Sequence, residues 1–288
     1  MDTWTILKVL EWTKGHFEQK GLDSPRLDAE LILAHVLKLQ RVMLYARFDQ
    51  PLATEELAQI RALVARRARK EPMAYLLGTK EIWSLPLEVT PATLIPRPDT
   101  ETLIEVSLKL LKDTPAPIIA DVGTGSGAIA LALAKELPAA TVYALEISAE
   151  ARAVAERNAA RHQLHNVRVL ASDLLSGLPL SVQGLNLVVA NLPYIPTAEL
   201  ANLMPDVRQY EPHLALDGGR DGLELIRRLI PEATRLLLPG AALALEAGLG
   251  QDQRLREALV QAGLQEVETV ADPGGVPRVT HGRRPVLH

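Results

Sequence analysis

The sequence predicts an α/β protein in which a mostly parallel sheet, with helices on both faces, follows a small all-helical domain. Up to about residue 80 the apolar residues recur only at helical spacing. From about residue 115 short apolar runs alternate with helical patterns, and a proline-rich segment separates the two parts. Alternation of strands and helices is typical of a parallel sheet that is covered on both sides.

Two helical patterns stand out in the first part. Asp23-Ser24-Pro25 supplies capping side chains and a first-turn proline, and Leu27 and Leu31 then fall on one helical face. A second helix opens at Thr54 and ends in the basic run 66–70. That run is interpreted either as a solvated helix end, whose cations suit the helix dipole, or as a docking patch for an acidic or RNA-bearing partner.

The segment from Gly78 to Pro98 is predicted to be a linker or a small hairpin, because its prolines disfavour a helix. The expected organisation is therefore a helical substrate-recognition domain over 1–80, a linker or hairpin over 81–98, and a third part over 99–288 that carries the sheet. In that third part, strands are predicted at 118–121, 141–146, 167–171, 185–190 and 242–246, and helices at 128–137, 149–162, 222–237 and 251–262.

The composition excludes several classes of protein. Of 288 residues 48% are hydrophobic and 23% charged, which is ordinary globular usage and argues against disorder or a coiled coil. The net charge of −4 argues against holding nucleic acid by bulk charge. The absence of cysteine excludes disulfides and thiolate chemistry. No signal peptide or membrane span is recognised, so the expected setting is the cytoplasm, and no membrane partner is expected.

The sharpest local signal is the glycine-rich turn Asp121-Val122-Gly123-Thr124-Gly125-Ser126-Gly127, which follows a predicted strand and opens a helix. Glycines let the backbone turn tightly and approach a ligand closely. The spacing is not that of a dinucleotide fingerprint, and no Gly-Lys-Ser/Thr follows, which disfavours a phosphate loop. Glu146 ends the next predicted strand, where an acid can accept both hydroxyls of a ribose. The alternative is that Glu146 is an exposed acid at a strand end.

This spacing resembles the cofactor site of S-adenosylmethionine-dependent methyltransferases with a Rossmann-like sheet. The resemblance implies S-adenosyl-L-methionine as cofactor and S-adenosyl-L-homocysteine as product. It implies that the glycines border the methionine and ribose, that Glu146 binds the ribose, and that Asp173 and Leu174 flank the adenine. The implied cofactor-binding residues are Gly123, Thr124, Gly125, Ser126, Gly127, Glu146, Asp173, Leu174 and Asn191.

A second motif, Asn191-Leu192-Pro193-Tyr194, directly follows the strand predicted at 185–190. It resembles the Asn-Pro-Pro-Tyr motif of enzymes that methylate a planar, conjugated nitrogen. The resemblance implies that Asn191, Pro193 and Tyr194 are catalytic and that 191–194 bind the substrate. An amide NH2 is a poor nucleophile with two donor hydrogens, which an asparagine oxygen and a backbone carbonyl can accept. Leu192 departs from the family pattern: its carbonyl is kept, but the ring that fixes φ is lost.

Further motifs narrow the resemblance. Glu71 to Gly78, Leu94 to Glu101, and Glu211-Pro212 with Ala215-Leu216, Gly218-Gly219 and Asp221-Gly222 resemble the signatures of the peptide chain release factor glutamine methyltransferases. This resemblance implies methylation of the side-chain nitrogen of the glutamine in a Gly-Gly-Gln loop, with release factors as partners gripped by the helical domain. A monomer without direct nucleic-acid binding is expected.

Two other functions remain open at this point. One is a DNA adenine or ribosomal RNA amino-group methyltransferase, which shares the Asn-x-Pro-Tyr chemistry but normally needs a basic surface. The other is a non-catalytic adaptor disabled by Leu192. Arg97, Thr100 and Glu101 are interpreted either as an active-site wall or as ordinary capping of a helix near Thr100. No metal site is predicted, since His162 and His165 have no evident third ligand.

Overall fold

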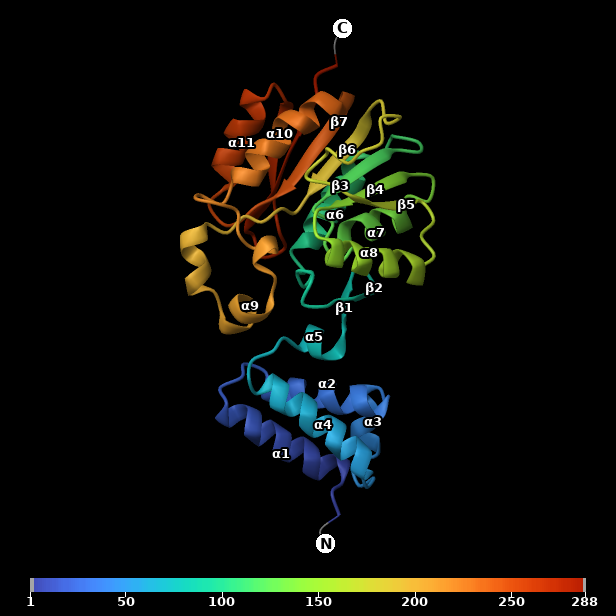
Figure 1. Ribbon diagram of the computed structural model, residues 1–288, viewed down its shortest axis with the longest axis vertical. Coiled ribbons are helices and arrows are strands. Elements are labelled where there is room, and N and C mark those ends of the chain that lie inside the picture. The colour runs from blue at the N-terminus through green and yellow to red at the C-terminus, as the bar shows by residue number, and fades with distance from the viewer. Residues whose placement is uncertain (1–2, 287–288) are drawn as a thin grey trace. The chain divides into compact units, whose positions relative to one another are not determined.

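The computed structural model describes residues 3–286, and its chain divides into two compact units. The first unit comprises the residues up to Gly78 together with Met204–Tyr210, and the second comprises Thr79–Leu203 and the residues from Glu211 onward (Figure 1). The return of Met204–Tyr210 to the first unit is a feature that sequence patterns did not predict. His288, which the sequence suggests is a tail residue, lies outside the described residues.

The first unit is helical, as predicted. Its helices are α1 (Ile6–Gln19), α2 (Pro25–Leu37), α3 (Arg41–Ala46), α4 (Thr54–Arg67), α5 (Met73–Leu77) and α9 (Pro205–Tyr210). Phe17, Ile32 and Leu33 are among its fully buried side chains. Helix α9 contacts the rest of this unit, and the contacts include a hydrogen bond from the Tyr210 hydroxyl to the Arg69 carbonyl (2.9 Å).

The prediction for the core-facing side of α2 is wrong at Leu27, which is 40% exposed. The buried side instead includes the acids Asp28 and Glu30, because each is paired with arginine. Arg67 Nε lies 2.7 Å from Asp28 Oδ2, and Arg41 Nη2 lies 2.6 Å from Glu30 Oε2. Arg67, the second residue of the basic run, is therefore used inside the unit, which neither interpretation of the run anticipated. Buried charges of this kind are tolerated only when paired.

The second unit opens with an antiparallel hairpin of β1 (Thr79–Ile82) and β2 (Leu85–Glu88). The two residues of its turn, Trp83 and Ser84, have φ of 51° and 52°, the conformation that a two-residue hairpin turn requires. Asn158 holds the hairpin: its side-chain oxygen accepts from the Glu88 N–H (2.7 Å) and its Nδ2 donates to the Glu88 carbonyl (3.0 Å).

The predicted fold class is confirmed by a seven-stranded sheet with the order β5-β4-β3-β6-β7-β9-β8. The parallel strands are β3 (Ile118–Val122), β4 (Thr141–Glu146), β5 (Val167–Ala171), β6 (Leu185–Ala190) and β7 (Leu237–Glu246), and the antiparallel ones are β8 (Gln265–Ala271) and β9 (Pro277–Arg283). The chain steps outward from β3 to β5 and then returns to β6 on the other side of β3. Ligands of open α/β sheets bind at the carboxyl ends of strands at such a switch point.

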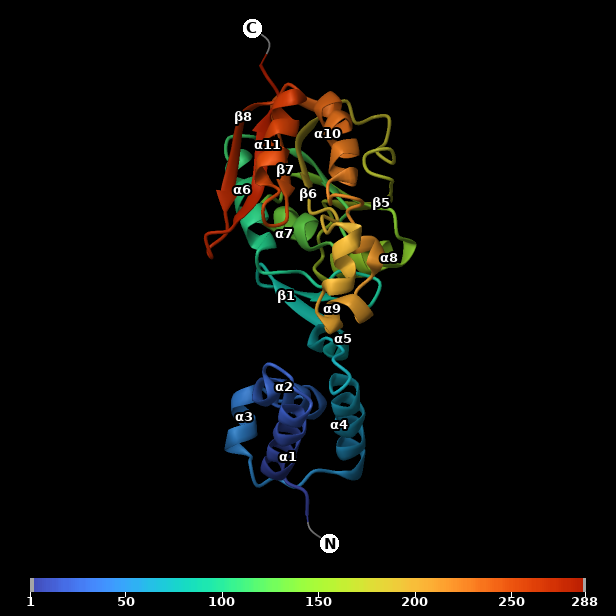
Figure 2. The same cartoon turned by 90° about the vertical axis from the view of Figure 1, so that its left-hand side faces the viewer.

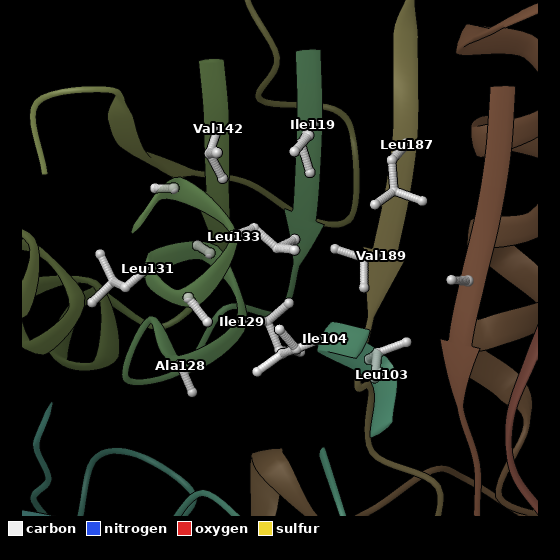
Figure 3. Close-up of a cluster of buried hydrophobic side chains, with 14 of the residues drawn as sticks. Leu103, Ile104, Ile119, Ala128, Ile129, Leu131, Leu133, Val142, Leu187 and Val189 are labelled. Carbon is white, nitrogen blue, oxygen red and sulfur yellow. The ribbon is translucent and has the colours of Figure 1, made fainter. Parts of the chain in front are cut away.

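Helices cover both faces of the sheet. They are α6 (Thr100–Leu110), α7 (Ala128–Glu136), α8 (Ala149–Arg161), α10 (Glu224–Leu236) and α11 (Asp252–Gln261), with 3₁₀ turns η1 (Thr197–Asn202) and η2 (His213–Ala215). On one face Leu103, Leu133 and other residues of α6 and α7 pack on Ile119 and Val189 (Figure 3). On the other face Val188 and Leu243 pack against α10 and α11. Successive strand residues thus serve opposite cores, as the pleat of a strand requires.

Two features of the carboxyl-terminal region were not predicted. The strands β8 and β9 form an antiparallel edge to the sheet, with β8 outermost (Figure 2). Arg283 is not a tail residue but belongs to β9, where its Nη1 donates to the Gly240 carbonyl (2.8 Å). Among residues 3–286, no helix is long and apolar enough to cross a membrane.

Candidate active site

A cavity of about 340 Å³ lies at the carboxyl ends of β3, β4, β5 and β6, entirely within the second unit. Its walls include the glycine-rich turn, the start of α6, and the segments that follow β4, β5 and β6. Of the residues proposed from sequence, those that line it are Gly123, Thr124, Gly125, Ser126, Glu146, Asp173, Leu174, Asn191, Leu192 and Pro193. Gly127 and Tyr194 do not line the cavity. The fold therefore collects into one place residues that are up to 70 positions apart.

The glycines of the turn have different tasks. All three have positive φ, of 74° at Gly123, 56° at Gly125 and 88° at Gly127. A Cβ on Gly125 would meet nothing within 4 Å, so this position faces open space that a ligand can enter. A Cβ on Gly127 would lie 3.1 Å from Leu131 Cδ1, which assigns this glycine to the close packing of α7. The prediction that Gly127 binds the cofactor has no geometric support, because the residue faces its own helix.

Asp121 holds the glycine-rich turn in place through hydrogen bonds. It was not proposed as a site residue from the sequence. The Thr124 hydroxyl and the Ala130 N–H both donate to Asp121 Oδ2, at 2.6 and 3.1 Å. Its Oδ1 has no hydrogen-bond partner among the described residues. Burial raises the pKa of this carboxyl to about 7, and the nearby charge of Glu146 adds to the rise. Its position directly before the glycines was the signal that could have singled it out.

The raised pKa predicts a pH dependence of stability. Because the folded state holds this proton up to about pH 7 and an unfolded aspartate releases it near 3.8, stability falls as pH rises through that window. We expect Asp121→Asn to flatten this fall, so that the free energies of unfolding at pH 5 and pH 8 differ less than in the unchanged protein. Denaturant titration at both pH values measures the difference. An unaltered difference would show that Asp121 is ionised throughout.

Glu146 is a buried acid and not an exposed strand-end residue. It is 8% exposed, and its carboxylate accepts from the Gly125 N–H (2.9 Å) and the Ser148 N–H (3.0 Å). Each carboxylate oxygen has a second lone pair. The side chain lines the cavity, so it can accept further hydrogen bonds from a ligand there. These contacts exclude the alternative interpretation of this residue.

We expect Glu146→Ala to weaken binding of the methyl donor. A hydrogen bond to a charged group contributes roughly 1.5–3 kcal/mol, which corresponds to about a 10- to 150-fold rise in Kd. Isothermal titration calorimetry measures the change. Glu150→Ala removes an exposed carboxylate from the adjoining helix and serves as the matched control. Equal affinity in the two variants would contradict the ribose-binding role.

The segment after β5 places Asp173 and Leu174 on the cavity wall. Leu174 is buried, and its φ is 49°. Asp173 is half-exposed, and Arg228 of α10 donates to its Oδ2 (2.7 Å). Arg228 also lines the cavity, which no sequence signal indicated. One carboxylate oxygen of Asp173 is thus held by arginine, and the other is available for a donor on a ligand.

Hydrogen bonds with side chains of other elements anchor the segment 191–194, which follows β6. Asn191 Nδ2 donates to the Thr100 hydroxyl (3.2 Å), and Gln251 Nε2 donates to the Tyr194 carbonyl (2.8 Å). Leu192 is buried in the core beneath the cavity, and a Cβ on Gly123 would lie 3.0 Å from its Cδ2. The leucine that replaces the family proline therefore joins the two motifs by packing. Burial raises the pKa of the Tyr194 phenol to about 12, so it is neutral at physiological pH.

Of the three residues interpreted as active-site wall or as helix capping, two lie at the cavity. Arg97 and Thr100 line the cavity, whereas Glu101 turns away and accepts from the Trp83 N–H (2.9 Å). Arg97 pairs with the buried carboxylate of Glu211, which also accepts from the Ile95 N–H (3.1 Å). Two segments that are over 100 residues apart are thereby joined at the cavity. Asp99 occupies the capping position of α6 but makes no capping hydrogen bond with its side chain.

Comparison with known proteins agrees with this geometry. Residues 8–78 match the family described as PrmC N-terminal domain, and residues 119–210 match a methyltransferase domain family. Among solved structures, the catalytic domain of hMettl16, in complex with an RNA hairpin, has a TM-score of 0.58 at 18% identity, covering 78% of this chain and 82% of that one. A methyltransferase from Pyrococcus furiosus has a TM-score of 0.51 at 20% identity, covering 77% and 99%. These two structures establish the fold alone.

Curated relatives are much closer in sequence. The release factor glutamine methyltransferase of Geobacter sulfurreducens is 47% identical over 282 residues, which cover 98% of each chain. That of Escherichia coli K12 is 42% identical over 278 residues, covering 96% of this chain and 99% of the relative. The aligned residues cover nearly the whole of this chain, and so both of its units. The chain belongs to the release factor glutamine methyltransferase family.

Proposed function

We propose that this protein transfers a methyl group from S-adenosylmethionine to the side-chain amide nitrogen of the glutamine in the Gly-Gly-Gln motif of peptide chain release factors. The observation that carries the proposal is the placement of Asn191, Leu192 and Pro193 beside the glycine-rich turn at one cavity. One motif suits a planar amide and the other suits the methyl donor. The named function of the curated relatives supplies the substrate class.

The cavity fits the methyl donor. The open face of Gly125, the carboxylate of Glu146 and the apolar side chain of Leu174 all face one space of about 340 Å³. Glu146 would accept from the ribose hydroxyls, and Leu174 would pack on the adenine, with Asp173 accepting from its amino group. S-adenosylmethionine, when bound, supplies an electrophilic methyl group on a sulfonium. No step requires a metal, and the described residues contain no cluster of metal-ligating side chains.

The residues after β6 would prepare the glutamine amide for attack. The Asn191 side-chain oxygen and the Leu192 carbonyl would accept the two amide hydrogens, which orients the nitrogen and draws electron density toward it. The nitrogen forms a bond to the methyl carbon, and the carbon–sulfur bond breaks with its electron pair left on sulfur. Positive charge then develops on nitrogen, where these acceptors stabilise it. The methylated nitrogen finally loses a proton to water.

Four further expectations stay predictions. The helical domain over 1–80 recognises the release factor, and 81–98 connects it to the methyltransferase domain over 99–288. The protein acts as a monomer. It does not bind nucleic acid directly. It works in the cytoplasm, where release factors meet ribosomes.

Transfer of labelled methyl groups tests the function. The protein is incubated with labelled S-adenosylmethionine and, separately, with a release factor, with the same factor carrying Glu in place of the Gly-Gly-Gln glutamine, with duplex DNA, and with ribosomal RNA. Label is expected on the unchanged release factor alone, with a mass increase that peptide mapping places on the glutamine. Label only on nucleic acid would favour the amino-group methyltransferase of the Asn-x-Pro-Tyr class. No label on any acceptor would favour the adaptor.

A further inference from the structure

Behind Asn191 lies a carboxyl group that neither motif includes. Glu246 is the last residue of β7, is 1% exposed and does not line the cavity. The neighbouring strands pair in parallel with Ala190 opposite Leu245, so the next residues, Asn191 and Glu246, are adjacent. Val189 and Ala244 belong to the core on the α6 side of the sheet. Side chains alternate between faces, so Asn191 and Glu246 both point toward α6.

Thr100, at the start of α6, completes the group. Its hydroxyl accepts from Asn191 Nδ2 (3.2 Å), and hydrogen bonds from Thr100 and Asn191 both favour the charged form of Glu246. The Asn191 amide nitrogen has two hydrogens and can only donate, whereas a carboxylate can only accept. The amide nitrogen of Asn191 is therefore directed toward Thr100 and Glu246. The amide oxygen is thereby left for the substrate.

We propose that Glu246 is a positioning residue for methyl transfer, which, together with Thr100, fixes the side-chain orientation of Asn191 so that its oxygen faces the glutamine amide. The inference rests on the proposed function of Asn191. A buried carboxylate suits this task because it has no hydrogen to offer the asparagine oxygen. A neutral acid or an amide at 246 could donate to that oxygen and stabilise the opposite orientation, with the NH2 group facing the substrate NH2.

The charges around Glu246 are consistent with an ionisable role. Arg278 of β9 faces it and favours the carboxylate, while Asp99, which precedes α6, opposes it. The charge of Glu246 also raises the pKa of the Tyr194 phenol. Arg278 is shared with Asp99 (2.9 Å) and Asp272 (3.3 Å), and Glu246 Oε2 has no hydrogen-bond partner among the described residues. Burial, opposed by Thr100, Arg278 and Asn191 and reinforced by the charge of Asp99, raises the pKa of Glu246 to about 7.

The test compares Glu246→Gln with the unchanged protein in single-turnover methylation of a release factor. Substitution by glutamine keeps the volume of the side chain and replaces an acceptor by a donor. We expect turnover to fall by about 10- to 100-fold, less than on outright loss of Asn191. The Kd of S-adenosylmethionine, measured by calorimetry, is expected to stay within about 2-fold, since Glu246 lies outside the cavity. In the unchanged protein kcat is expected to decline below about pH 7, where Glu246 takes up a proton, and this decline is expected to disappear in the variant.

A double variant shows whether Glu246 acts through Asn191. In an Asn191→Ala background, Glu246→Gln is expected to change turnover by no more than about 2-fold, because there is no side-chain amide left to orient. Thr100→Val is expected to slow methyl transfer, whereas Thr100→Ser, which keeps the hydroxyl, is expected to transfer at the full rate. This pair tests the positioning of Asn191 even if Glu246→Gln does not bind the donor. Two results would overturn the inference and leave the proposed function standing. In the first, the losses of turnover from Asn191→Ala and Glu246→Gln multiply in the double variant. In the second, Glu246→Gln keeps full activity and an unaltered pH profile. If the protein without substitutions labelled no release factor, both the inference and the proposed function would be overturned.

Discussion

Replacing Asn191 with alanine is expected to lower the turnover of methyl transfer by about 100-fold or more, by analogy with the loss of one hydrogen-bond partner of a transition state. The variant loses the oxygen that accepts from the substrate amide as charge develops on nitrogen. It keeps the Leu192 carbonyl, which retains part of the alignment. Single-turnover transfer of labelled methyl groups to a release factor measures the effect.

The affinity for the methyl donor distinguishes a catalytic role of Asn191 from a structural one. The donor is expected to be held mainly by the glycine-rich turn, Glu146 and Leu174, so the Kd of S-adenosylmethionine in Asn191→Ala is expected to stay close to that of the unchanged protein. Asn202→Ala, at an exposed asparagine in η1, is the matched control and is expected to transfer at the full rate. Turnover that is equal in the two variants would refute the proposed role of Asn191.

The parts of the fold that could be predicted are those in which the pattern is local. The parallel strands β3, β4 and β6 are short apolar runs, because they are buried on both faces, and these runs are visible in the sequence. The residues Gln265 to Arg283 were missed since β8 and β9 lie at the sheet edge and carry mixed polar and apolar side chains. The inward side of α2 was misjudged because buried ion pairs with α3 and α4 place Asp28 and Glu30 inside. Such pairing depends on partners that are distant in sequence.

The same distinction applies to the site. The glycine-rich turn, Glu146 and Asn191 could be proposed from motifs because each motif holds its residues in consecutive positions. Their supports come from elsewhere in the chain: Glu211 reaches Arg97, Arg228 reaches Asp173, and Glu246 lies behind Asn191. Motif reasoning therefore identified the groups that face the ligand and gave no role to those that hold them, although Glu211 lies in one of the quoted signatures. Glu246 left a weaker trace, an acid at the carboxyl end of an otherwise apolar strand.

The backbone support of the Asn191 to Tyr194 segment leads to a second large expected effect, at Gly222. Its φ is 79°, and a Cβ there would lie 2.2 Å from the Tyr194 carbonyl oxygen and 2.5 Å from Gln251 Nε2. Those two atoms form the hydrogen bond that anchors the end of the motif. Gly222→Ala must therefore push the segment away from Gln251 or break the bond, and either change moves the substrate acceptors.

A displacement of about 1 Å in a reacting geometry can reduce the rate by about 100-fold, and we expect a loss of this size in Gly222→Ala. Gly275→Ala is the matched control: its φ of 80° gives the same backbone strain, but a Cβ there would meet nothing within 4 Å. Both variants should lose stability from the strain, measured by thermal unfolding, and Gly222→Ala should lose more because of its clash with Tyr194. Only Gly222→Ala should lose methyl transfer. If Gly275→Ala lost as much transfer as Gly222→Ala, the effect would follow from general destabilisation, and the anchoring of Tyr194 by Gln251 would have no special part in catalysis.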